Sequence, residues 1–330
     1  MHKIVFSGYR VFMKFGDLSY FKQRAKEAGM KVVGVRSESD DELKEEIRDA
    51  SAVVVIARTI NSGMIEAMQK CKIILALSVG YDCVDVRAAT SKGIIVSNTP
   101  NYCTDEVANH TVTLLLSVAR KLMLIIPRTS DAHWDYNFTR PIFNFKDRKL
   151  GIIGLGRIGR CVVLKVRGMG MSVMAYDPYL DDDIFKLLGV ERRYELEDLL
   201  SEVDYLSIHA PLTPETYHMI DSKALSLLKE HAVIVNTARG GIIDEKALVT
   251  ALREGRLTGA GLDVLEREPP EAHNPLLTLE QVIITPHIAW YSEESFQREM
   301  EDGMDEIVRV LSGHRPRYIV NPEVLWKRNL

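Results

Sequence analysis

Short hydrophobic runs alternate with longer amphipathic stretches through the first hundred residues. Four of these runs are rich in β-branched residues and predict strands at 3–6, 32–35, 53–57 and 73–77. The polar stretches between them have the length and the apolar spacing of helices. Strands that alternate with helices in this way favour a parallel sheet with helices on both faces.

The same alternation begins again near residue 149 and predicts a second sheet. Its expected strands lie at 149–154, 172–176, 205–208, 233–235, 259–262 and 282–284. Between the two series, an apolar pattern at 104–122 predicts a helix that carries the chain from one sheet to the other. A last helix is expected near 292–311, and periodicity alone leaves open which sheet it packs on.

The length of 330 residues suits two domains, because a single hydrophobic core stops growing at about 250–300 residues. Hydrophobic residues make up 46% of the chain, and no apolar run approaches the length of a membrane span. The N-terminus has no apolar core of signal-peptide length. A net charge of −4 with scattered basic residues argues against nucleic acid as a partner. We therefore expect a protein that contacts neither a membrane nor nucleic acid.

The four cysteines, at positions 71, 83, 103 and 161, show neither CxxC spacing nor a histidine at zinc-finger spacing. We expect no disulfide framework and no metal site. Such cysteine usage indicates a reducing compartment, and we expect the protein in the cytoplasm.

A glycine-rich hexapeptide follows the first expected strand of the second series and precedes an amphipathic helical pattern. It reads Gly154-Leu155-Gly156-Arg157-Ile158-Gly159. In this setting the first glycine permits a tight turn, the second lets a pyrophosphate approach the backbone, and the third lets helix and strand pack closely. The free amides of the helix N-terminus then bind the phosphates. The sequence therefore predicts a dinucleotide site.

An acidic residue ends the next expected strand. Asp177 comes 21 positions after Gly156 (177 − 156). A carboxylate at this place accepts hydrogen bonds from the ribose hydroxyls of NAD and repels the additional phosphate of NADP. The alternative is an unrelated glycine-rich turn followed by a loop acid. Because strand, helix and acid occur together, the pattern favours NAD.

Three polar residues follow later expected strands, at the sheet edge where open α/β sheets bind ligands. They are Arg239, Glu268 and His287. Each has a structural alternative: Arg239 as a cap of a strand end, Glu268 as a solvated loop acid, and His287 as a turn histidine. Their joint occurrence downstream of the dinucleotide motif favours catalysis.

The chain resembles the D-isomer-specific 2-hydroxyacid dehydrogenases over nearly its whole length. Arg239 and Glu268 are 29 positions apart (268 − 239), and Glu268 and His287 are 19 apart (287 − 268), each inside a longer matching segment. The other matching segments are the glycine motif with Asp177, His209-Ala210-Pro211-Leu212-Thr213, and Gly261-Leu262-Asp263-Val264. The resemblance implies hydride transfer between NAD and a small D-2-hydroxy acid or its 2-keto partner.

The chemistry of that reaction gives each of the three residues a role. Hydride transfer to a 2-keto acid leaves negative charge on the carbonyl oxygen, which His287 neutralises by giving up a proton. In reverse, His287 takes the hydroxyl proton. Glu268 orients the ring and favours its charged form. Arg239 offers a planar fork of donors for the substrate carboxylate and carbonyl.

Further cofactor and substrate contacts are implied by the resemblance alone. The implied cofactor residues beyond the glycine motif and Asp177 are His209, Ala210, Pro211, Thr216, Thr237, Ala238, Arg239, Asp263 and His287. The backbone amides of Val79 and Gly80 match a loop that binds the substrate carboxylate. Ala76 departs from many relatives, which carry an arginine three positions before this valine.

The segments 236–246 and 290–293 resemble the C-terminal binding protein branch of the family. There a tryptophan lines the substrate pocket, so Trp290 is a predicted substrate contact. Plain packing at a helix start is the alternative. Trp134 and the helix from Thr104 resemble segments that relatives use for dimer contacts, which implies a homodimer.

The resemblance implies an α/β protein of two Rossmann-like, doubly wound parallel-sheet domains with a cleft between them. We expect a discontinuous substrate-binding (catalytic) domain at 1–101 plus 293–330, and an NAD-binding Rossmann domain at 102–292. One alternative function is an NAD-sensing scaffold of the C-terminal binding protein kind. Another is phosphoglycerate dehydrogenase without a regulatory domain. Formate dehydrogenases pair the histidine with glutamine, so Glu268 argues against them.

Overall fold

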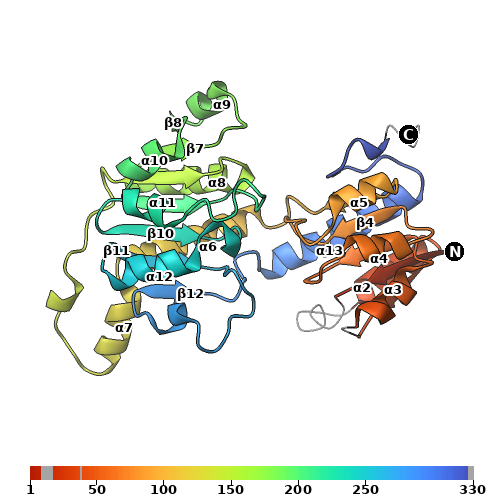
Figure 1. Cartoon of the computed structure of the whole chain (residues 1–330), viewed down its shortest axis with the longest axis horizontal. Coiled ribbons are helices and arrows are strands. Elements are labelled where there is room, and N and C mark those ends of the chain that lie inside the picture. Colours follow the sequence, from red (N-terminus) through yellow and green to blue (C-terminus); the bar gives the residue numbers. More distant parts are fainter. Residues whose placement is uncertain (9–17, 38, 326–330) are drawn as a thin grey trace. The chain divides into compact units, whose positions relative to one another are not determined.

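The computed structural model describes residues 1–8, 18–37 and 39–325 and divides the chain into two compact units. Unit 1 comprises Met1–Cys103 and Ser292–Leu330, and unit 2 comprises Thr104–Tyr291. Each unit is built around one sheet in which the paired strands are parallel (Figure 1). The predicted α/β fold with two doubly wound parallel sheets is thus confirmed.

Unit 1 contains a five-stranded sheet in the order β2-β1-β3-β4-β5. Its strands are β1 (His2–Phe6), β2 (Met30–Gly34), β3 (Ala52–Val55), β4 (Ile73–Ala76) and β5 (Ile95–Asn98). The helices on one face are α2 (Ser19–Glu27) and α13 (Glu293–Leu311), and those on the other are α3 (Asp40–Ile47), α4 (Ser62–Ala67) and α5 (Val86–Ser91). Each face buries its own apolar cluster, which is why the strands read as nearly continuous hydrophobic runs.

Strand β5 was not predicted, because two of its four residues are polar although all four are buried. The hydroxyl of Ser97 donates to Glu306 Oε1 (3.1 Å), and the amide nitrogen of Asn98 donates to the carbonyl of Val79 (2.7 Å). These partners lie far away in the sequence, so no local pattern marks the strand. Strand β3 ends at Val55, short of the predicted end at Ala57, which has a φ of 46°.

The C-terminal segment belongs to unit 1, a question that periodicity left open. Helix α13 packs on the sheet through Met300, Met304 and Ile307. The segment after it forms an antiparallel bridge between Ile319 and Ser97. Within this helix Glu299 is 6% exposed, and its carboxyl shares a hydrogen bond with Tyr102.

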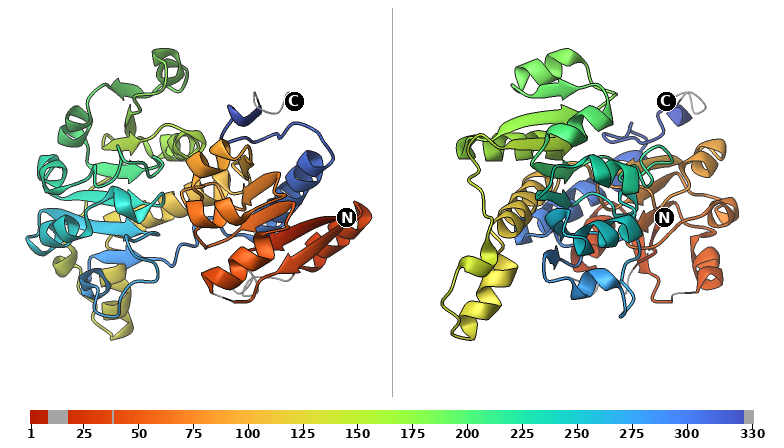
Figure 2. Two further views of the ribbon diagram at one scale, coloured as in Figure 1. Left: turned by 45° about the vertical axis from the view of Figure 1, so that its right-hand side comes forward. Right: turned by 60° about the vertical axis from the view of Figure 1, so that its left-hand side comes forward.

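Unit 2 contains a seven-stranded sheet in the order β12-β11-β10-β9-β6-β7-β8. Figure 2 shows this unit from two further directions, with helices on both sides of the sheet. Its strands are β6 (Lys149–Ile153), β7 (Ser172–Tyr176), β8 (Glu191–Arg193), β9 (Tyr205–Ile208), β10 (Ala232–Asn236), β11 (Leu257–Leu262) and β12 (Val282–Ile284). Strand β8 was not predicted, since its three residues are Glu-Arg-Arg. Charged residues suit its place at the edge of the sheet.

Helices cover both faces of the second sheet. One face carries α6 (Thr104–Ala119), α8 (Arg157–Val166) and α9 (Asp182–Leu187), and the other carries α10 (Leu196–Glu202), α11 (Ser222–Leu227) and α12 (Glu245–Arg253). Four short 3₁₀ helices, η1 (Asn137–Thr139), η2 (Arg167–Met169), η3 (Gly240–Ile242) and η4 (Pro275–Thr278), lie in the connections.

The predicted helix at 104–122 is shorter than expected. Helix α6 ends at Ala119, Lys121 takes a left-handed conformation (φ 54°), and α7 (Leu122–Ser130) continues at an angle of 65°. Within the described ranges no single helix is long and apolar enough to cross a membrane; only α6 and α7 taken together meet that test, and they are bent.

Candidate active site

The turn between β6 and α8 carries the glycine motif. Gly154 has a φ of 87°, and a Cβ on it would lie 2.7 Å from the backbone nitrogen of Ala210. A Cβ on Gly159 would lie 2.4 Å from the carbonyl oxygen of Gly154, so only glycine lets the helix approach the strand. At Gly156 there is nothing within 4 Å, which leaves the backbone open to a ligand. The motif therefore fits a dinucleotide pyrophosphate at the N-terminus of α8.

This turn lies at the point where the order of the sheet reverses, since β6 is paired with both β7 and β9. Asp177 follows β7, and its Oδ2 accepts a hydrogen bond from the backbone nitrogen of Leu155 (2.9 Å). Its Oδ1 accepts one from the backbone nitrogen of Tyr179 (3.1 Å). A carboxylate has about four acceptor sites, so it can still accept from ribose hydroxyls.

The segment after β9 packs against the glycine turn. The backbone nitrogen of His209 donates to the carbonyl of Ile153 (2.7 Å), and its Nε2 pairs with the hydroxyl of Ser207 (2.9 Å). Burial lowers the pKa of His209 to about 3, so the ring is neutral at pH 7. Pro211 is exposed beyond it, and Thr216 closes the loop by donating to the Pro211 carbonyl (2.6 Å).

His287 and Glu268 lie together in unit 2, 2.6 Å apart between Nδ1 and Oε2. The other oxygen of Glu268 accepts from the backbone nitrogen of Leu265 (3.0 Å). Burial raises the pKa of Glu268, but the hydrogen bond and charge of His287, the Leu265 N–H and the charge of Arg239 together hold that pKa below its ordinary value. The carboxylate therefore stays ionised and can stabilise a proton on His287.

Arg239 follows β10, and its Nη1 donates to the carbonyl of Ala238 (2.8 Å). The positive charge of Arg239 is close enough to Glu268 to help lower the pKa of its carboxyl. The turn itself is held by Asn236, whose amide group donates to the Arg239 carbonyl (2.9 Å) and accepts from the Ala238 nitrogen (3.0 Å). The three predicted catalytic residues thus come from neighbouring connections at one edge of the sheet.

The backbone of His287 takes a left-handed conformation, with a φ of 54°, which costs about 1 kcal/mol or more for a residue with a Cβ. Asp263 holds it there. The Asp263 carbonyl accepts from the His287 nitrogen (2.8 Å), and its carboxylate accepts from the backbone nitrogens of Ile288 (2.9 Å) and Ala289 (2.8 Å). Its side chain also accepts from the Thr285 hydroxyl (2.5 Å).

Asp263 is 2% exposed and is hydrogen-bonded to the turn that carries His287, contacts that sequence reasoning missed. Its expected cofactor contact remains a prediction. His110 on α6 supports the same turn, with its Nε2 2.9 Å from the Thr285 hydroxyl. No local signal marks these contacts, because His110 is 175 positions from Thr285. The hydroxyl of Thr237 also has a partner within unit 2, because it forms a hydrogen bond with the hydroxyl of Thr111 (2.8 Å).

Trp290 lies next to the turn that carries His287. Its Nε1 donates to the carbonyl of His287 (3.0 Å), and its ring packs edge-on against Tyr291, with centroids 5.4 Å apart. These contacts fix the indole beside the predicted proton donor.

The two predicted substrate-loop residues, Val79 and Gly80, belong to unit 1 and follow β4. The Val79 carbonyl accepts from the Asn98 amide (2.7 Å), and the Gly80 carbonyl accepts from the Ser78 hydroxyl (2.5 Å). With these carbonyls engaged by unit 1, the loop has a defined conformation.

Residues 112–289 match the model of the D-isomer specific 2-hydroxyacid dehydrogenase NAD-binding domain. The chain belongs to the D-isomer-specific 2-hydroxyacid dehydrogenase family. A glyoxylate reductase of Korarchaeum cryptofilum is 39% identical over 288 residues, which cover 86% of each protein. A D-3-phosphoglycerate dehydrogenase of Methanocaldococcus jannaschii is 41% identical over 282 residues, 85% of this chain; the match spans only about half of that relative (53%).

The solved structures agree with this membership. A D-lactate dehydrogenase of Aquifex aeolicus, complexed with NAD and lactic acid, aligns with a TM-score of 0.83 at 29% identity. The alignment covers 94% of this chain and 96% of that one. The chain is therefore an NAD-dependent oxidoreductase of the kind that acts on CH–OH groups, with NAD as its cofactor.

Proposed function

We propose that this dehydrogenase interconverts a small 2-keto acid and its D-2-hydroxy acid, with Arg239, Glu268 and His287 as its catalytic set. The observation that carries the proposal is the His287–Glu268 hydrogen bond of 2.6 Å in a chain of this family. An ionised carboxylate held against one ring nitrogen leaves the other free to exchange a proton with substrate.

When bound at this site, the cofactor would supply the hydride as NADH for reduction of the keto acid and would accept it as NAD⁺ for oxidation of the hydroxy acid. In the reductive direction, Nε2 of His287 gives its proton to the carbonyl oxygen as negative charge develops there. Glu268 stabilises the protonated ring before transfer and fixes its orientation. Arg239 binds the substrate carboxylate and carbonyl through its two-pronged guanidinium. In the oxidative direction His287 takes the proton from the hydroxyl group.

The proposed cofactor site is the turn 154–159 with Asp177 and the His209–Pro211 segment. The open backbone at Gly156 supports pyrophosphate binding, and the carboxylate of Asp177 supports ribose binding and a preference for NADH over NADPH. Thr216, Thr237, Ala238 and Asp263 are proposed as further neighbours. Tighter binding of NADPH than of NADH in a fluorescence titration would contradict the assignment of Asp177.

The proposed substrate is small, with a carboxylate next to the reacting carbon. Two relatives carry the names glyoxylate reductase and D-3-phosphoglycerate dehydrogenase, and a structural neighbour was solved with lactic acid. In unit 1 we assign carboxylate binding to the amides of Val79 and Gly80, and in unit 2 we assign it to Arg239. Trp290, held against the His287 turn, is assigned to the side-chain pocket, where an indole favours an apolar or thioether tail.

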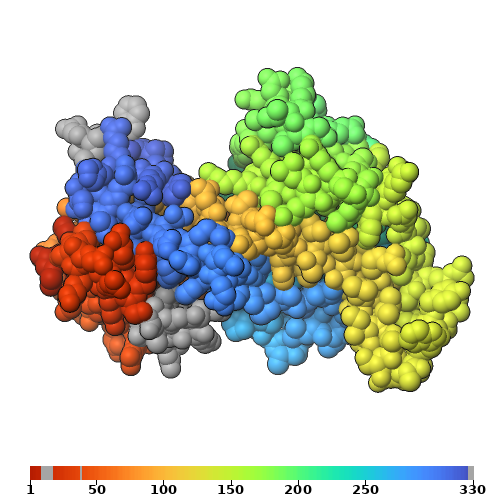
Figure 3. Space-filling model, turned by 180° about the vertical axis from the view of Figure 1, so that it is seen from behind, coloured from red at the N-terminus to blue at the C-terminus, as the bar shows by residue number. Residues whose placement is uncertain are grey.

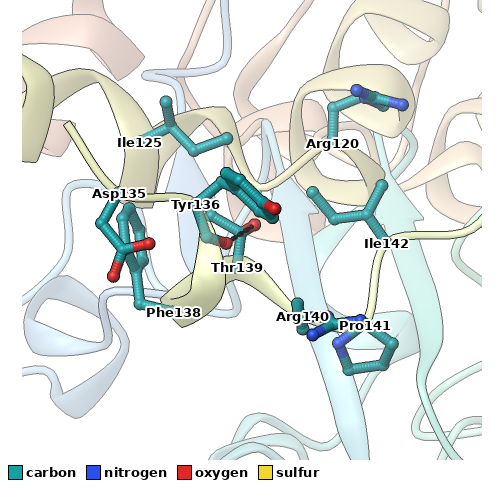
Figure 4. Close-up of a pocket in the computed structure, with 9 residues that line it drawn as sticks. All are labelled: Arg120, Ile125, Asp135, Tyr136, Phe138, Thr139, Arg140, Pro141 and Ile142. Carbon is teal, nitrogen blue, oxygen red and sulfur yellow. Dashed lines mark hydrogen bonds between the residues drawn. The ribbon is translucent and has the colours of Figure 1, made fainter.

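We also propose a homodimer formed through the arm, defined as α7 and the segment to residue 143. Helix α7 has no buried residue, and the arm exposes Ile126 (59%), Trp134 (92%) and Tyr136 (75%). Figure 3 shows the arm in yellow, projecting from the rest of unit 2. A cavity of about 610 Å³ at the base of the arm is lined by Tyr136, Phe138 and Ile142 among others (Figure 4). Such an exposed apolar surface is typical of an interface.

The test of function is NADH oxidation with glyoxylate, hydroxypyruvate, phosphohydroxypyruvate, pyruvate and 4-methylthio-2-oxobutyrate. The wild type is expected to reduce at least one of these acids, and His287→Ala is expected to lose turnover. His231→Ala is the matched control, because His231 precedes β10 at the opposite end of the strand from Arg239. Tight NADH binding without turnover of any acid would favour the alternative, an NAD-sensing scaffold of the C-terminal binding protein kind. The cytoplasmic location stays a prediction.

A further inference from the structure

A second histidine–carboxylate pair lies in unit 2, and its carboxylate is carried by the same connection after β11 as Glu268 of the proposed catalytic pair. His218 Nε2 and Glu266 Oε1 are 3.0 Å apart, and their side chains are only 29% and 32% exposed. Glu266 stands two positions before Glu268 on one loop. We infer that His218 and Glu266 are positioning residues that hold Glu268, and through it His287, in the reactive arrangement. This inference rests on the proposed function of the catalytic pair.

Glu266 is anchored by both its side chain and its backbone to the first turn of α12. Its Oε1 accepts from the backbone nitrogen of Glu245 (2.9 Å), and its own backbone nitrogen donates to Glu245 Oε1 (2.5 Å). The second oxygen of Glu245 accepts from the amide nitrogen of Asn274 (3.1 Å). These reciprocal bonds join the loop that carries Glu268 to a rigid helix start.

His218 extends the anchor to a third segment, the loop after β9. Its backbone is left-handed (φ 52°), and its nitrogen donates to the carbonyl of Gly241 (2.8 Å). The ring stacks on Tyr217, with centroids 4.0 Å apart and planes 15° from parallel. With its backbone bonded and its ring stacked, His218 presents Nε2 to Glu266 in a fixed direction. The pair therefore ties the loop after β9 and the Arg239 connection to the Glu268 loop.

The link from Glu266 to the reacting groups runs through the preceding residue. The backbone nitrogen of Leu265 donates to Glu268 Oε1 (3.0 Å), which sets the direction of the other oxygen toward His287. The backbone of Leu265 also packs on the glycine after Arg239, since a Cβ on Gly240 would lie 1.9 Å from the Leu265 carbonyl carbon. Anchoring Glu266 thus limits the movement of the adjacent Leu265, whose N–H orients Glu268, and of the backbone next to Arg239.

A nearby pair provides a matched control with the same chemistry and a different setting. His273 Nε2 and Glu271 Oε2 are 2.9 Å apart, but their side chains are 86% and 44% exposed. Both residues lie on one short stretch of the loop, so their contact joins no separate segments. Surface pairs of this kind contribute little. Removing His273 is expected to leave kcat and KM unchanged.

The test compares Glu266→Ala, Glu266→Gln and His273→Ala for kcat, for KM of the keto acid and for KM of NADH. Glu266→Ala is expected to lower kcat about tenfold with KM for NADH unchanged, because a misplacement of about 1 Å near the chemistry costs up to ~100-fold. Glu266→Gln is expected to recover most of the activity, since its amide oxygen accepts the same two hydrogen bonds. In a Glu268→Gln background, Glu266→Ala is expected to have almost no further effect.

Full additivity of the two substitutions, or wild-type kinetics of Glu266→Ala, would overturn the inference. If Glu266→Ala does not fold, the same comparison is made with His218→Ala and with His218→Gln, whose amide nitrogen can replace Nε2. A wild type that turns over no keto acid refutes the proposed function and this inference with it. A wild type that is active and sensitive to His287→Ala, but insensitive to every change at positions 218 and 266, refutes only the positioning role.

Discussion

Replacing Glu299 by glutamine is expected to stabilise unit 1 in a way that depends on pH. Burial raises the pKa of Glu299 from 4.5 to about 8, against the opposing effect of the Tyr102 hydrogen bond. The folded chain therefore keeps the carboxyl protonated up to about pH 8, whereas the unfolded chain ionises it from about pH 4.5. The stability that the neutral Glu299 carboxyl gives the folded chain is therefore complete below the pKa of the unfolded chain. It is lost as the pH rises toward the pKa of Glu299 in the folded chain.

The size of the effect follows from the difference between the two pKa values. A difference of about 3.5 units, at about 1.4 kcal/mol per unit, sets an upper limit of roughly 5 kcal/mol above pH 8. At pH 5.5 only about 1–2 kcal/mol of this loss is present. Glutamine has no charge to bury and keeps an acceptor for the Tyr102 hydroxyl, so its advantage over glutamate is expected to grow by about 3 kcal/mol between pH 5.5 and 8.5.

The assay is urea denaturation of the wild type and Glu299→Gln at both pH values, followed by circular dichroism. Glu301→Gln is the matched control, because Glu301 lies on the same helix but is exposed. Its effect is expected to be small and equal at the two pH values. If Glu299→Gln changed stability by the same amount at pH 5.5 and 8.5, the carboxyl would not be held neutral by burial, and the reasoning would fail.

Three further predictions concern the site. Gly154→Ala is expected to weaken NADH binding at least about tenfold in a fluorescence titration, because the new Cβ would lie 2.7 Å from backbone at a position where φ is 87°. Gly168→Ala is the control, because a Cβ there has nothing within 4 Å, and it is expected to leave the titration unchanged. Asp263→Asn replaces an acceptor by a donor facing a backbone N–H and is expected to lower kcat about tenfold or more; wild-type kcat would contradict its hold on His287. Glu268→Gln removes the charge that favours protonated His287, so the acid limb of hydroxy acid oxidation is expected to move to lower pH, and an unchanged profile would remove that role.

The sequence determined those features whose cause lies within a few residues. The β-branched runs became strands because alternation of strand and helix leaves few other ways to bury them. The glycine turn was predicted because Gly154, Gly156 and Gly159 stand in a fixed relation to one strand and one helix. The order of Arg239, Glu268 and His287 pointed to one edge of the sheet, since each follows a strand that ends there.

Tertiary structure decided what depends on partners far along the chain. Half of the residues of β5 are polar, yet the strand is buried. Its Ser97 hydroxyl donates a hydrogen bond to Glu306, which lies 209 positions away in the chain. The support of the His287 turn by Asp263 and His110 follows the same rule, as does the reciprocal bonding of Glu245 and Glu266. The sequence alone does not distinguish a polar residue that faces water from one that is bonded to a distant backbone nitrogen. Only packing decides between the two, because a buried polar group is stable only when a partner satisfies it.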